Sequence, residues 1–227
     1  MEKTSILIIY ISIFQPIINY IMKRVLFLLV VAFVAMSASA QITWNTKGGI
    51  GLAHCWGDAE GLSGHFVGKI GAGIEKPLTS NWSLMPSLEV AWKGAEEKFS
   101  DKGFEYKSTL DLFYIQVPVV AAYRVNINDD WNCALKAGPY LAYGISGKIK
   151  GGYEGESFDE DFFSSNDEGP SGRRFDAGLD FGVDFEYHRF VFGVEYELGF
   201  ISIQKKFEDI IGSIRNAAFY ATVGFKF

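Results

Sequence analysis

The sequence predicts an all-β protein, and more specifically an eight-stranded antiparallel up-and-down transmembrane β-barrel. Three observations lead to this prediction. Segments in which apolar and polar residues alternate recur from residue 41 to the end of the chain, without convincing helical periodicity. The connections between these segments are short and long in turn, as in bacterial outer-membrane barrels. A secretory signal peptide precedes the first segment.

The composition fits a single β-rich domain and excludes disorder. The chain has 227 residues, 48% of them hydrophobic and 16% aromatic, with 25 glycines and 6 prolines. Its 21 basic and 27 acidic residues give a net charge of −6, which is not the basic balance of a nucleic-acid binder. Cys55 and Cys133 form no metal-ligand pattern. The expected strand register puts them near opposite rims, beyond the ~4.4–6.8 Å Cα separation of a disulfide, so we predict two free thiols.

Residues 22–40 have the three parts of a secretory signal peptide. Basic Lys23 and Arg24 precede an apolar run, and small residues ending at Ala40 form an A-x-A cleavage site. We therefore expect the exported domain to span residues 41–227. Since lipidation needs a cysteine directly after the cut, Gln41 excludes a lipoprotein made from this site.

Residues 1–21 stand upstream of this complete signal peptide. We therefore expect them to be an over-extended N-terminus, a mis-assigned start, with true initiation at Met22. The alternative is a membrane anchor over Ile6–Ile21, an apolar stretch that Pro16 and Asn19 interrupt.

Eight alternating segments are the expected strands, and an even number is typical of single-chain outer-membrane barrels. The clearest pair is Arg174–Phe200, where each arm has an apolar face opposite a face of acids and glycines. The expected strands are Thr43–Trp56, Phe66–Lys76, Trp82–Lys93, Leu110–Arg124, Trp131–Gly144, Phe175–Tyr187, Phe190–Ile203 and Ala217–Phe227.

The connections predict an orientation, because such barrels have short periplasmic turns and longer extracellular loops. The expected turns are Pro77–Asn81, Val125–Asp130 and His188–Arg189. The expected loops are Gly57–His65, Gly94–Thr109, Ile145–Arg174 and Ser202–Asn216. Both ends of the barrel domain are then expected on the periplasmic side.

The strand faces that carry charge must point into the lumen, because a charge in the lipid mid-plane costs a few kcal/mol. Lys93 lies on such a face. Two interpretations of the lumen stay open: it is either a packed polar core of ion pairs and water or a narrow ion path. The expected luminal charges are Lys47, Lys69, Glu75, Glu89, Lys136, Asp176, Asp180, Asp184, Glu186, Glu195, Glu197 and Lys226.

Aromatic residues gather at the predicted strand ends, where amphipathic rings favour the membrane interface. Trp44, Trp82, Trp131, Tyr187, Phe190 and Phe227 are expected at the periplasmic girdle. Trp56, Phe66 and Trp92 are expected at the external girdle.

Four segments carry a family resemblance: Tyr114–Arg124, Gly138–Lys148, Phe175–Phe190 and the terminal ATVGFKF. In order and spacing they resemble the PorT-like outer-membrane β-barrel family. The resemblance implies an eight-stranded barrel in the outer membrane of a Gram-negative bacterium, reached through the general secretory route. One namesake member is tied to protein secretion, a link not carried over to this chain. The amphipathic last strand resembles the signal that the barrel assembly machinery reads, so we expect that machinery as a partner during insertion.

The segment Gly151–Arg173 combines seven acids with four aromatic residues. Acid clusters can bind Ca²⁺, but the D-x-[DN]-x-[DN]-G spacing is absent, and a solvated surface loop is the favoured interpretation. Its aromatic residues could form a partner-binding patch or pack on the barrel rim. A protein partner is therefore expected, if anywhere, at the loop 145–174.

An enzyme is not expected. A lipid-hydrolase triad would need one of the histidines. Each fits a structural position better: His54 near the rim, His65 in a loop and His188 in a turn. We expect no cofactor and no metal. The sequence predicts a barrel acting in outer-membrane structure or surface interaction through its extracellular loops, surrounded by lipid and lipopolysaccharide. The alternative is a transport or secretion component, and a soluble lipocalin-like carrier would need an apolar interior.

Overall fold

A computed structural model describes residues 42–57, 62–101, 104–153, 156–163, 172–204 and 213–227. The predictions for residues 1–21 and 22–40 lie outside this part of the chain. Within it, no helix is long and apolar enough to span a membrane.

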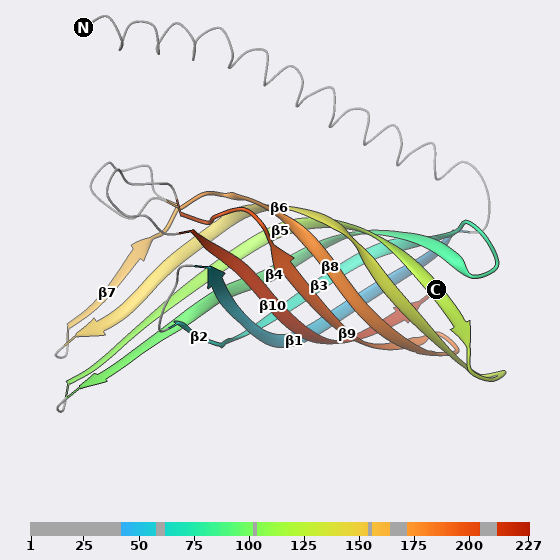
Figure 1. Cartoon of the computed structure of the whole chain (residues 1–227), viewed down its shortest axis with the longest axis horizontal. Helices are drawn as coiled ribbons and strands as arrows, with labels where there is room; N and C mark the ends of the chain where they lie inside the picture. Colours follow the sequence, from blue (N-terminus) through green and yellow to red (C-terminus); the bar gives the residue numbers. More distant parts are fainter. Residues whose placement is uncertain (1–41, 58–61, 102–103, 154–155, 164–171, 205–212) are drawn as a thin grey trace, which may run out of the picture. The chain divides into compact units, whose positions relative to one another are not determined.

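Eight long strands form a closed antiparallel ring (Figure 1). Consecutive long strands pair, and β1 pairs with β10 from Asn45 opposite Lys226 to Gly57 opposite Ile214, which closes the barrel. The prediction of an all-β eight-stranded antiparallel barrel is thereby confirmed. The strands are β1 (Thr43–Gly57), β3 (His65–Pro77), β4 (Trp82–Asp101), β5 (Phe104–Asn126), β6 (Trp131–Tyr153), β8 (Phe175–Tyr187), β9 (Phe190–Gly199) and β10 (Ile214–Lys226).

Two of the expected loops are largely strand, and this part of the sequence prediction was wrong. β4 and β5 stay paired as far as Asp101 opposite Phe104, and β6 continues to Tyr153. β7 (Glu156–Asp161) pairs with this extension of β6, and β2 (Leu62–Ser63) pairs with β4. These extensions carry charges on both faces and so lack the alternation of a lipid-facing strand, but their backbone hydrogen bonds do not require it. We call residues 94–101, 104–112 and 146–161 the projecting sheet.

Two strand ends also differ from the prediction near the long connection that follows β9. β9 ends at Gly199 rather than Ile203, and β10 begins at Ile214 rather than Ala217. Ile203 instead turns inward, where it is 1% exposed, and its backbone nitrogen donates to the Ile214 carbonyl at 2.8 Å. Ile203, which was expected at the end of this strand, therefore lies in the interior beyond the strand's end.

The three tight connections lie at one end of the barrel, which we call the turn end, and the projecting sheet lies at the other, the loop end (Figure 1). His188 adopts the left-handed φ of 51° in the two-residue turn between β8 and β9. In the turn between β5 and β6, the Asn128 side chain accepts from the backbone nitrogens of Asp130 and Trp131 at 3.0 and 2.9 Å.

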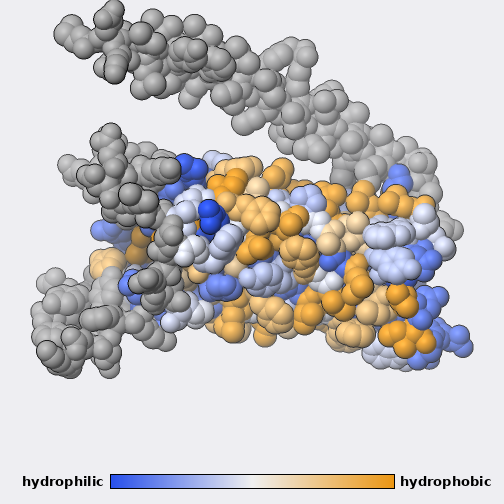
Figure 2. Space-filling model, in the orientation of Figure 1, coloured by the Kyte–Doolittle hydropathy of each residue, from blue (hydrophilic) through white to orange (hydrophobic). Residues whose placement is uncertain are grey.

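The outer wall is apolar and the interior is charged. Ile70, Leu88 and Val223 are 67%, 59% and 54% exposed, and apolar side chains cover much of the visible wall in Figure 2. So large an exposed apolar surface is unusual for a soluble protein and matches a wall that faces lipid. The acids and lysines on the opposite faces of the same strands are buried inside the barrel.

Close strand contacts require glycine at two points. A Cβ at Gly138 would lie 2.1 Å from the Val119 carbonyl oxygen on β5. Gly94 has a φ of +152° and stands where β4 passes from the barrel wall into the projecting sheet. Gly138 therefore permits the close approach of β5 and β6, and Gly94 permits that of β4 and β5, where a Cβ would clash with the Leu110 carbonyl oxygen.

Candidate functional site

Six basic and eight acidic side chains point into the lumen and form what we call the luminal charge network. It contains all twelve luminal residues expected from the sequence, together with Lys93 and Arg124. Its members are Lys47, Lys69, Lys93, Arg124, Lys136, Lys226, Glu75, Glu89, Asp176, Asp180, Asp184, Glu186, Glu195 and Glu197.

At the turn end, two bases and two acids from four strands close into a ring of ion pairs. Arg124 donates through Nε and Nη2 to Glu186 at 2.8 Å each, and Nη2 lies 2.6 Å from Glu75. Lys226 completes the ring at 2.7 Å from Glu75 and 2.8 Å from Glu186. A bidentate guanidinium–carboxylate pair has well-defined geometry, so this turn-end ring links β3, β5, β8 and β10.

Sequence reasoning missed the role of Arg124 because the residue stands at the end of a predicted strand. Its parity could have revealed it, since Tyr114, Gln116 and Ala122 on the same strand are all fully buried. Side chains two residues apart share a face, so Arg124 follows them into the lumen.

Lys69 lies at the centre of the lumen and contacts three carboxylates. Its Nζ is 3.0 Å from Glu197 and 3.5 Å from Glu89, and it also pairs with Glu195. All four side chains are at most 1% exposed. Gln116 donates to Glu197 Oε1 at 2.7 Å and to Glu89 Oε2 at 3.1 Å, the same two oxygens that Lys69 contacts.

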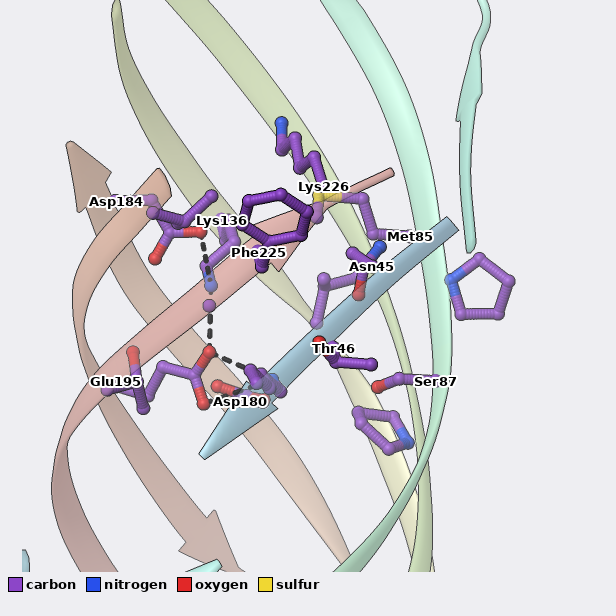
Figure 3. Close-up of a pocket in the computed structure, with 17 residues that line it drawn as sticks. Asn45, Thr46, Met85, Ser87, Lys136, Asp180, Asp184, Glu195, Phe225 and Lys226 are labelled. Atoms are coloured by element: carbon purple, nitrogen blue, oxygen red, sulfur yellow. Dashed lines mark hydrogen bonds and ion pairs between the residues drawn. The ribbon is translucent and has the colours of Figure 1, made fainter. Parts of the chain in front are cut away.

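Lys47 and Lys136 flank this centre on the side of the turn end. Lys47 lies 2.8 Å from Glu89 and 2.9 Å from Glu195. Lys136 lies 2.8 Å from Glu195 and 2.7 Å from Asp184, and Figure 3 shows it between these two acids. Three of these four pairs therefore join strands that are separated by one intervening strand, and the pair of Lys136 and Asp184 joins the neighbours β6 and β8. Because desolvation offsets much of the Coulomb attraction, the network specifies the packing more surely than it adds stability.

Toward the loop end the charges are joined by hydroxyl and amide groups. Lys93 lies 2.7 Å from Glu197 and 3.9 Å from Asp176, with its Nζ 4.1 Å from the centre of the Tyr140 ring. Tyr140 and Asn216 donate to Asp176 Oδ2 at 3.2 and 3.0 Å. Asp176 is thus held by neutral donors as well as by a lysine.

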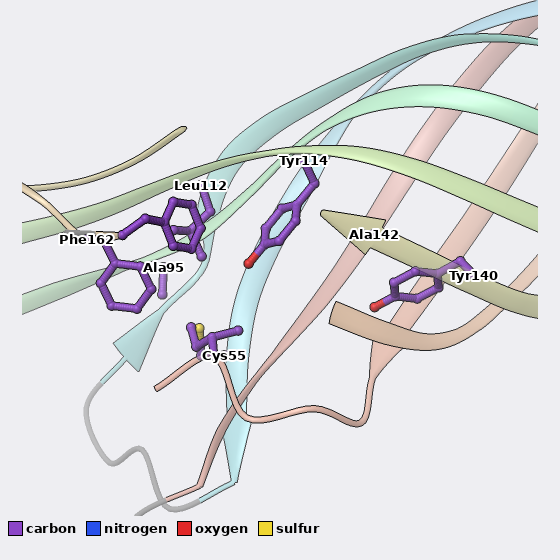
Figure 4. Packing of buried hydrophobic residues seen from close by; sticks show 9 residues of the cluster. Cys55, Ala95, Leu112, Tyr114, Tyr140, Ala142 and Phe162 are labelled. Atoms are coloured by element: carbon purple, nitrogen blue, oxygen red, sulfur yellow. The ribbon is translucent and has the colours of Figure 1, made fainter. Parts of the chain in front are cut away.

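A cluster of buried apolar side chains lies inside the barrel beyond this level, and we call it the loop-end plug. Phe162 and Phe163 turn back from the end of β7 and are 2% and 6% exposed. Figure 4 shows Phe162 beside Leu112 and Ala95, with Cys55 close by. The plug consists of Cys55, Ala95, Leu112, Tyr114, Tyr140, Ala142, Phe162, Phe163 and Ile203.

Two glycines of β6 make room for the plug. A Cβ at Gly144 would lie 2.4 Å from the Phe163 ring, and one at Gly147 would lie 2.7 Å from it. The Arg174 guanidinium covers the same ring at 4.8 Å. A partner patch built from Phe162 and Phe163 is therefore wrong, and of the described aromatic residues in this loop Phe158, at 37% exposed, stays on the surface. No periodicity marks this segment, so the inward turn of these two rings could not be predicted from a strand pattern.

A small cavity of about 40 Å³ lies between the turn-end ring and Lys69 (Figure 3). Asp180, Asp184, Lys136 and Glu195 line it together with polar side chains of the opposite wall. Asp180 is 3% exposed. The described lumen thus contains room for a few water molecules at this level.

The predicted girdle residues lie near both ends of the strands. At the turn end the rings of Trp131 and Tyr187 are 4.9 Å apart, and Trp44, Trp82, Phe190 and Phe227 are 61%, 48%, 51% and 66% exposed. At the loop end Trp92 stacks on Phe113 at 5.6 Å, and Trp56 donates to the Gly199 carbonyl at 3.2 Å. Phe66 is 58% exposed at the same end.

The three histidines do not share one site: Ala53 is the register partner of His65, so His54 and His65 point to opposite faces of the sheet, and His188 lies at the turn end. His65 begins β3, contrary to the expected loop position, and its Nε2 lies 3.0 Å from Asp111 while its ring meets Trp92 edge-on. His188 lies 3.4 Å from Asp130 at the exposed turn end, and His54 is half-buried on β1.

The cysteines are unpaired, as predicted, with Cys55 buried and Cys133 half-buried. Among the described residues, no group of three or more His, Cys, Asp or Glu side chains is arranged to hold a metal ion.

A closed eight-stranded barrel with an apolar outer wall and a charged interior defines a class, the small outer-membrane barrels. Residues 40–205 match the family described as outer membrane protein beta-barrel domain, and the chain belongs to this family. The protein is therefore located in the outer membrane of a Gram-negative bacterium. Curated protein sequences give no significant match.

Solved structures of other small barrels are similar at low sequence identity. The chain is 15% identical to Ail, the attachment invasion locus protein of Yersinia pestis, with 83% of this chain and 100% of that chain covered and a TM-score of 0.41. It is 13% identical to neisserial surface protein A, with 83% of this chain and 100% of that chain covered and a TM-score of 0.43. It is 12% identical to the N-terminal β-barrel domain of Pseudomonas aeruginosa OprF, with 82% of this chain and 100% of that chain covered and a TM-score of 0.34.

Proposed function

We propose that this protein is a non-enzymatic outer-membrane barrel whose lumen is closed to solutes, and that it acts in outer-membrane structure or surface interaction through its loop end. The observation that supports the proposal is the succession of side-chain clusters inside the lumen, which leaves one small cavity of about 40 Å³ among the described residues. The turn-end ring, the pairs around Lys69 and the loop-end plug follow one another along the barrel axis. An eight-stranded barrel is narrow enough for side chains to fill it in this way.

The loop end supplies the surface for interaction. Short turns of such barrels face the periplasm, so the projecting sheet extends from the outer surface of the cell. Exposed charges cover its described part, including Lys148 and Asp159, which pair at 3.0 Å. We propose that a protein partner contacts residues 145–174, that lipid and lipopolysaccharide surround the wall, and that the barrel assembly machinery inserts the chain.

Transport or secretion remains the competing function. A small-solute path would need the ring and the plug to open together, and the pairs described above oppose this. Docking on a secretion assembly would fit the PorT-like resemblance of four segments, and stable copurification with secretion components would favour it.

Planar-bilayer conductance tests the closed lumen. We expect no stable channel from the wild-type barrel, because the turn-end ring and the loop-end plug close the lumen on either side of the small cavity. The test variant is Phe163→Ala, which removes a ring from the plug. The matched control is Lys148→Ala, which changes only an exposed charge. Reproducible stepwise channels from the wild-type protein would refute the proposal.

Release of fatty acid from phospholipid or lipopolysaccharide tests the absence of catalysis. We expect no release above that from protein-free vesicles. Release that disappears in the His65→Asn variant would show that the pair of His65 and Asp111 is catalytic and would contradict the proposal.

A further inference from the structure

β7 is an edge strand at the margin of the projecting sheet (Figure 1). It pairs with β6 from Lys148 opposite Asp161 to Tyr153 opposite Glu156, and no other described strand pairs with it. The residues from 158 to 161 are all exposed. The side of β7 that faces away from β6, which we call the free edge, therefore presents backbone groups that can pair with a strand of another chain.

One hydrogen bond shows which backbone groups of β7 lie at the free edge. The Phe162 nitrogen donates to the Gly147 carbonyl at 2.9 Å, one step beyond the last residue pair of the β6–β7 ladder. Bonded and non-bonded pairs alternate in an antiparallel ladder, so Phe158 and Glu160 direct their N–H and C=O groups at β6. The residues that direct these groups at the free edge are Ser157, Asp159 and Asp161.

The side chains of β7 are mainly acidic, since four of its six residues are Asp or Glu. Lys148 pairs with Asp159 at 3.0 Å, whereas Glu160 and Asp161 form no ion pair with a described residue. Asp159 and Asp161 share one face of the strand, and Glu160 lies on the other face with Phe158, which is 37% exposed. A strand added at the free edge would therefore meet acids on both of its faces.

These acids determine which kind of strand the free edge accepts. Like charges opposite each other in a sheet are destabilising, which opposes pairing with the β7 strand of a second copy, while opposite charges are favourable. Given the surface interaction proposed above, on which this inference rests, we propose that the free edge of β7 binds an extended basic segment of a protein partner by strand addition. Backbone hydrogen bonds supply the affinity, and Lys or Arg side chains of the partner face the acids of β7.

The test uses the full barrel in nanodiscs of phosphatidylcholine, a lipid without net charge. The probe is a fluorescent peptide of alternating lysine and valine, and binding is read from its anisotropy. We expect saturable binding of this peptide and none of a peptide of alternating glutamate and valine. The lysine–valine peptide with every backbone nitrogen methylated keeps its charge but cannot donate to β7, so its affinity should fall at least ~10-fold.

Two variants of Asp159 separate the backbone from the charge. Asp159→Asn removes one exposed charge and should weaken binding by at most ~5-fold. Asp159→Pro removes the same charge and also an N–H at the free edge, so it should weaken binding at least ~10-fold. Both should keep heat-modifiable migration, because β7 lies beyond the barrel wall. The matched control is Asp129→Asn in an exposed turn at the turn end, which should leave binding unchanged.

Equal affinities of Asp159→Asn and Asp159→Pro would overturn strand addition, and so would a lysine–valine peptide that does not bind. Equal binding of the methylated and unmethylated peptides to the wild-type barrel would do the same without relying on any variant. Each of these results leaves the closed barrel intact. Channels in the conductance test would instead refute the closed barrel and leave strand addition standing.

Discussion

Replacing Lys69 with methionine removes the cation that contacts three carboxylates at the centre of the lumen. Lys69 pairs with Glu89, Glu195 and Glu197, and its side chain is fully buried. Methionine keeps much of the apolar stem but carries no charge. The variant therefore tests whether the luminal ion pairs are needed for the folded barrel.

The expected cost follows from what each carboxylate retains. Lys47 stays 2.8 Å from Glu89 and 2.9 Å from Glu195. Lys93 stays 2.7 Å from Glu197. Removing one partner of a buried pair costs about 3–5 kcal/mol, and with other cations in place we expect the lower end, ~3 kcal/mol. That loss shifts the folding equilibrium on the order of a hundredfold.

The assay is urea unfolding of the barrel in lipid vesicles, followed by tryptophan fluorescence and extrapolated to zero urea. Lys150→Met is the matched control, because Lys150 is 53% exposed and its pair with Asp111 should contribute at most ~1 kcal/mol. Adding Glu197→Gln to Lys69→Met should restore part of the loss by removing an acid. Equal losses in Lys69→Met and Lys150→Met would refute the reasoning.

Three further predictions concern the plug, a strand contact and the thiols. Phe163→Ala should lower the free energy of unfolding in the same assay by about 3–5 kcal/mol, since it empties a buried ring site, and a loss below ~1 kcal/mol would contradict the plug. Gly138→Val should prevent formation of the heat-modifiable band, because its side chain would meet the β5 backbone, and normal migration would argue against this packing. A maleimide should label Cys133 faster than Cys55 in the folded protein and both alike after unfolding, and equal folded rates would contradict the burial of Cys55.

The barrel could be predicted because lipid imposes a strict rule on each strand. In β8 and β9, charges such as Asp184 and Glu195 alternate with apolar residues, and a slip of one residue would place them in hydrocarbon. Fold class, strand number and the two free thiols followed from this alternation and were confirmed.

The features beyond the membrane wall were not predictable in the same way. In the projecting sheet, Glu96 and Glu97 interrupt the alternation, since no lipid selects for it, and the backbone ladder continues regardless. The inward turn of Phe162 depends on contacts with Leu112 and Ala95, which are distant in sequence. The ion-pair partners within the lumen also depend on the tertiary structure. The alternation places Lys69 on the luminal face but does not predict which three acids it contacts.

The most direct test of the closed, ion-paired lumen is nitrogen NMR of the lysine ammonium groups in lipid nanodiscs. Ammonium protons held in buried ion pairs exchange slowly with water, while solvated ones exchange too fast to observe. We predict resolved ammonium signals for Lys69, Lys93 and Lys136, whose side chains are 0%, 1% and 6% exposed, and none for Lys148 and Lys150. Rapid exchange at all five lysines would contradict the account.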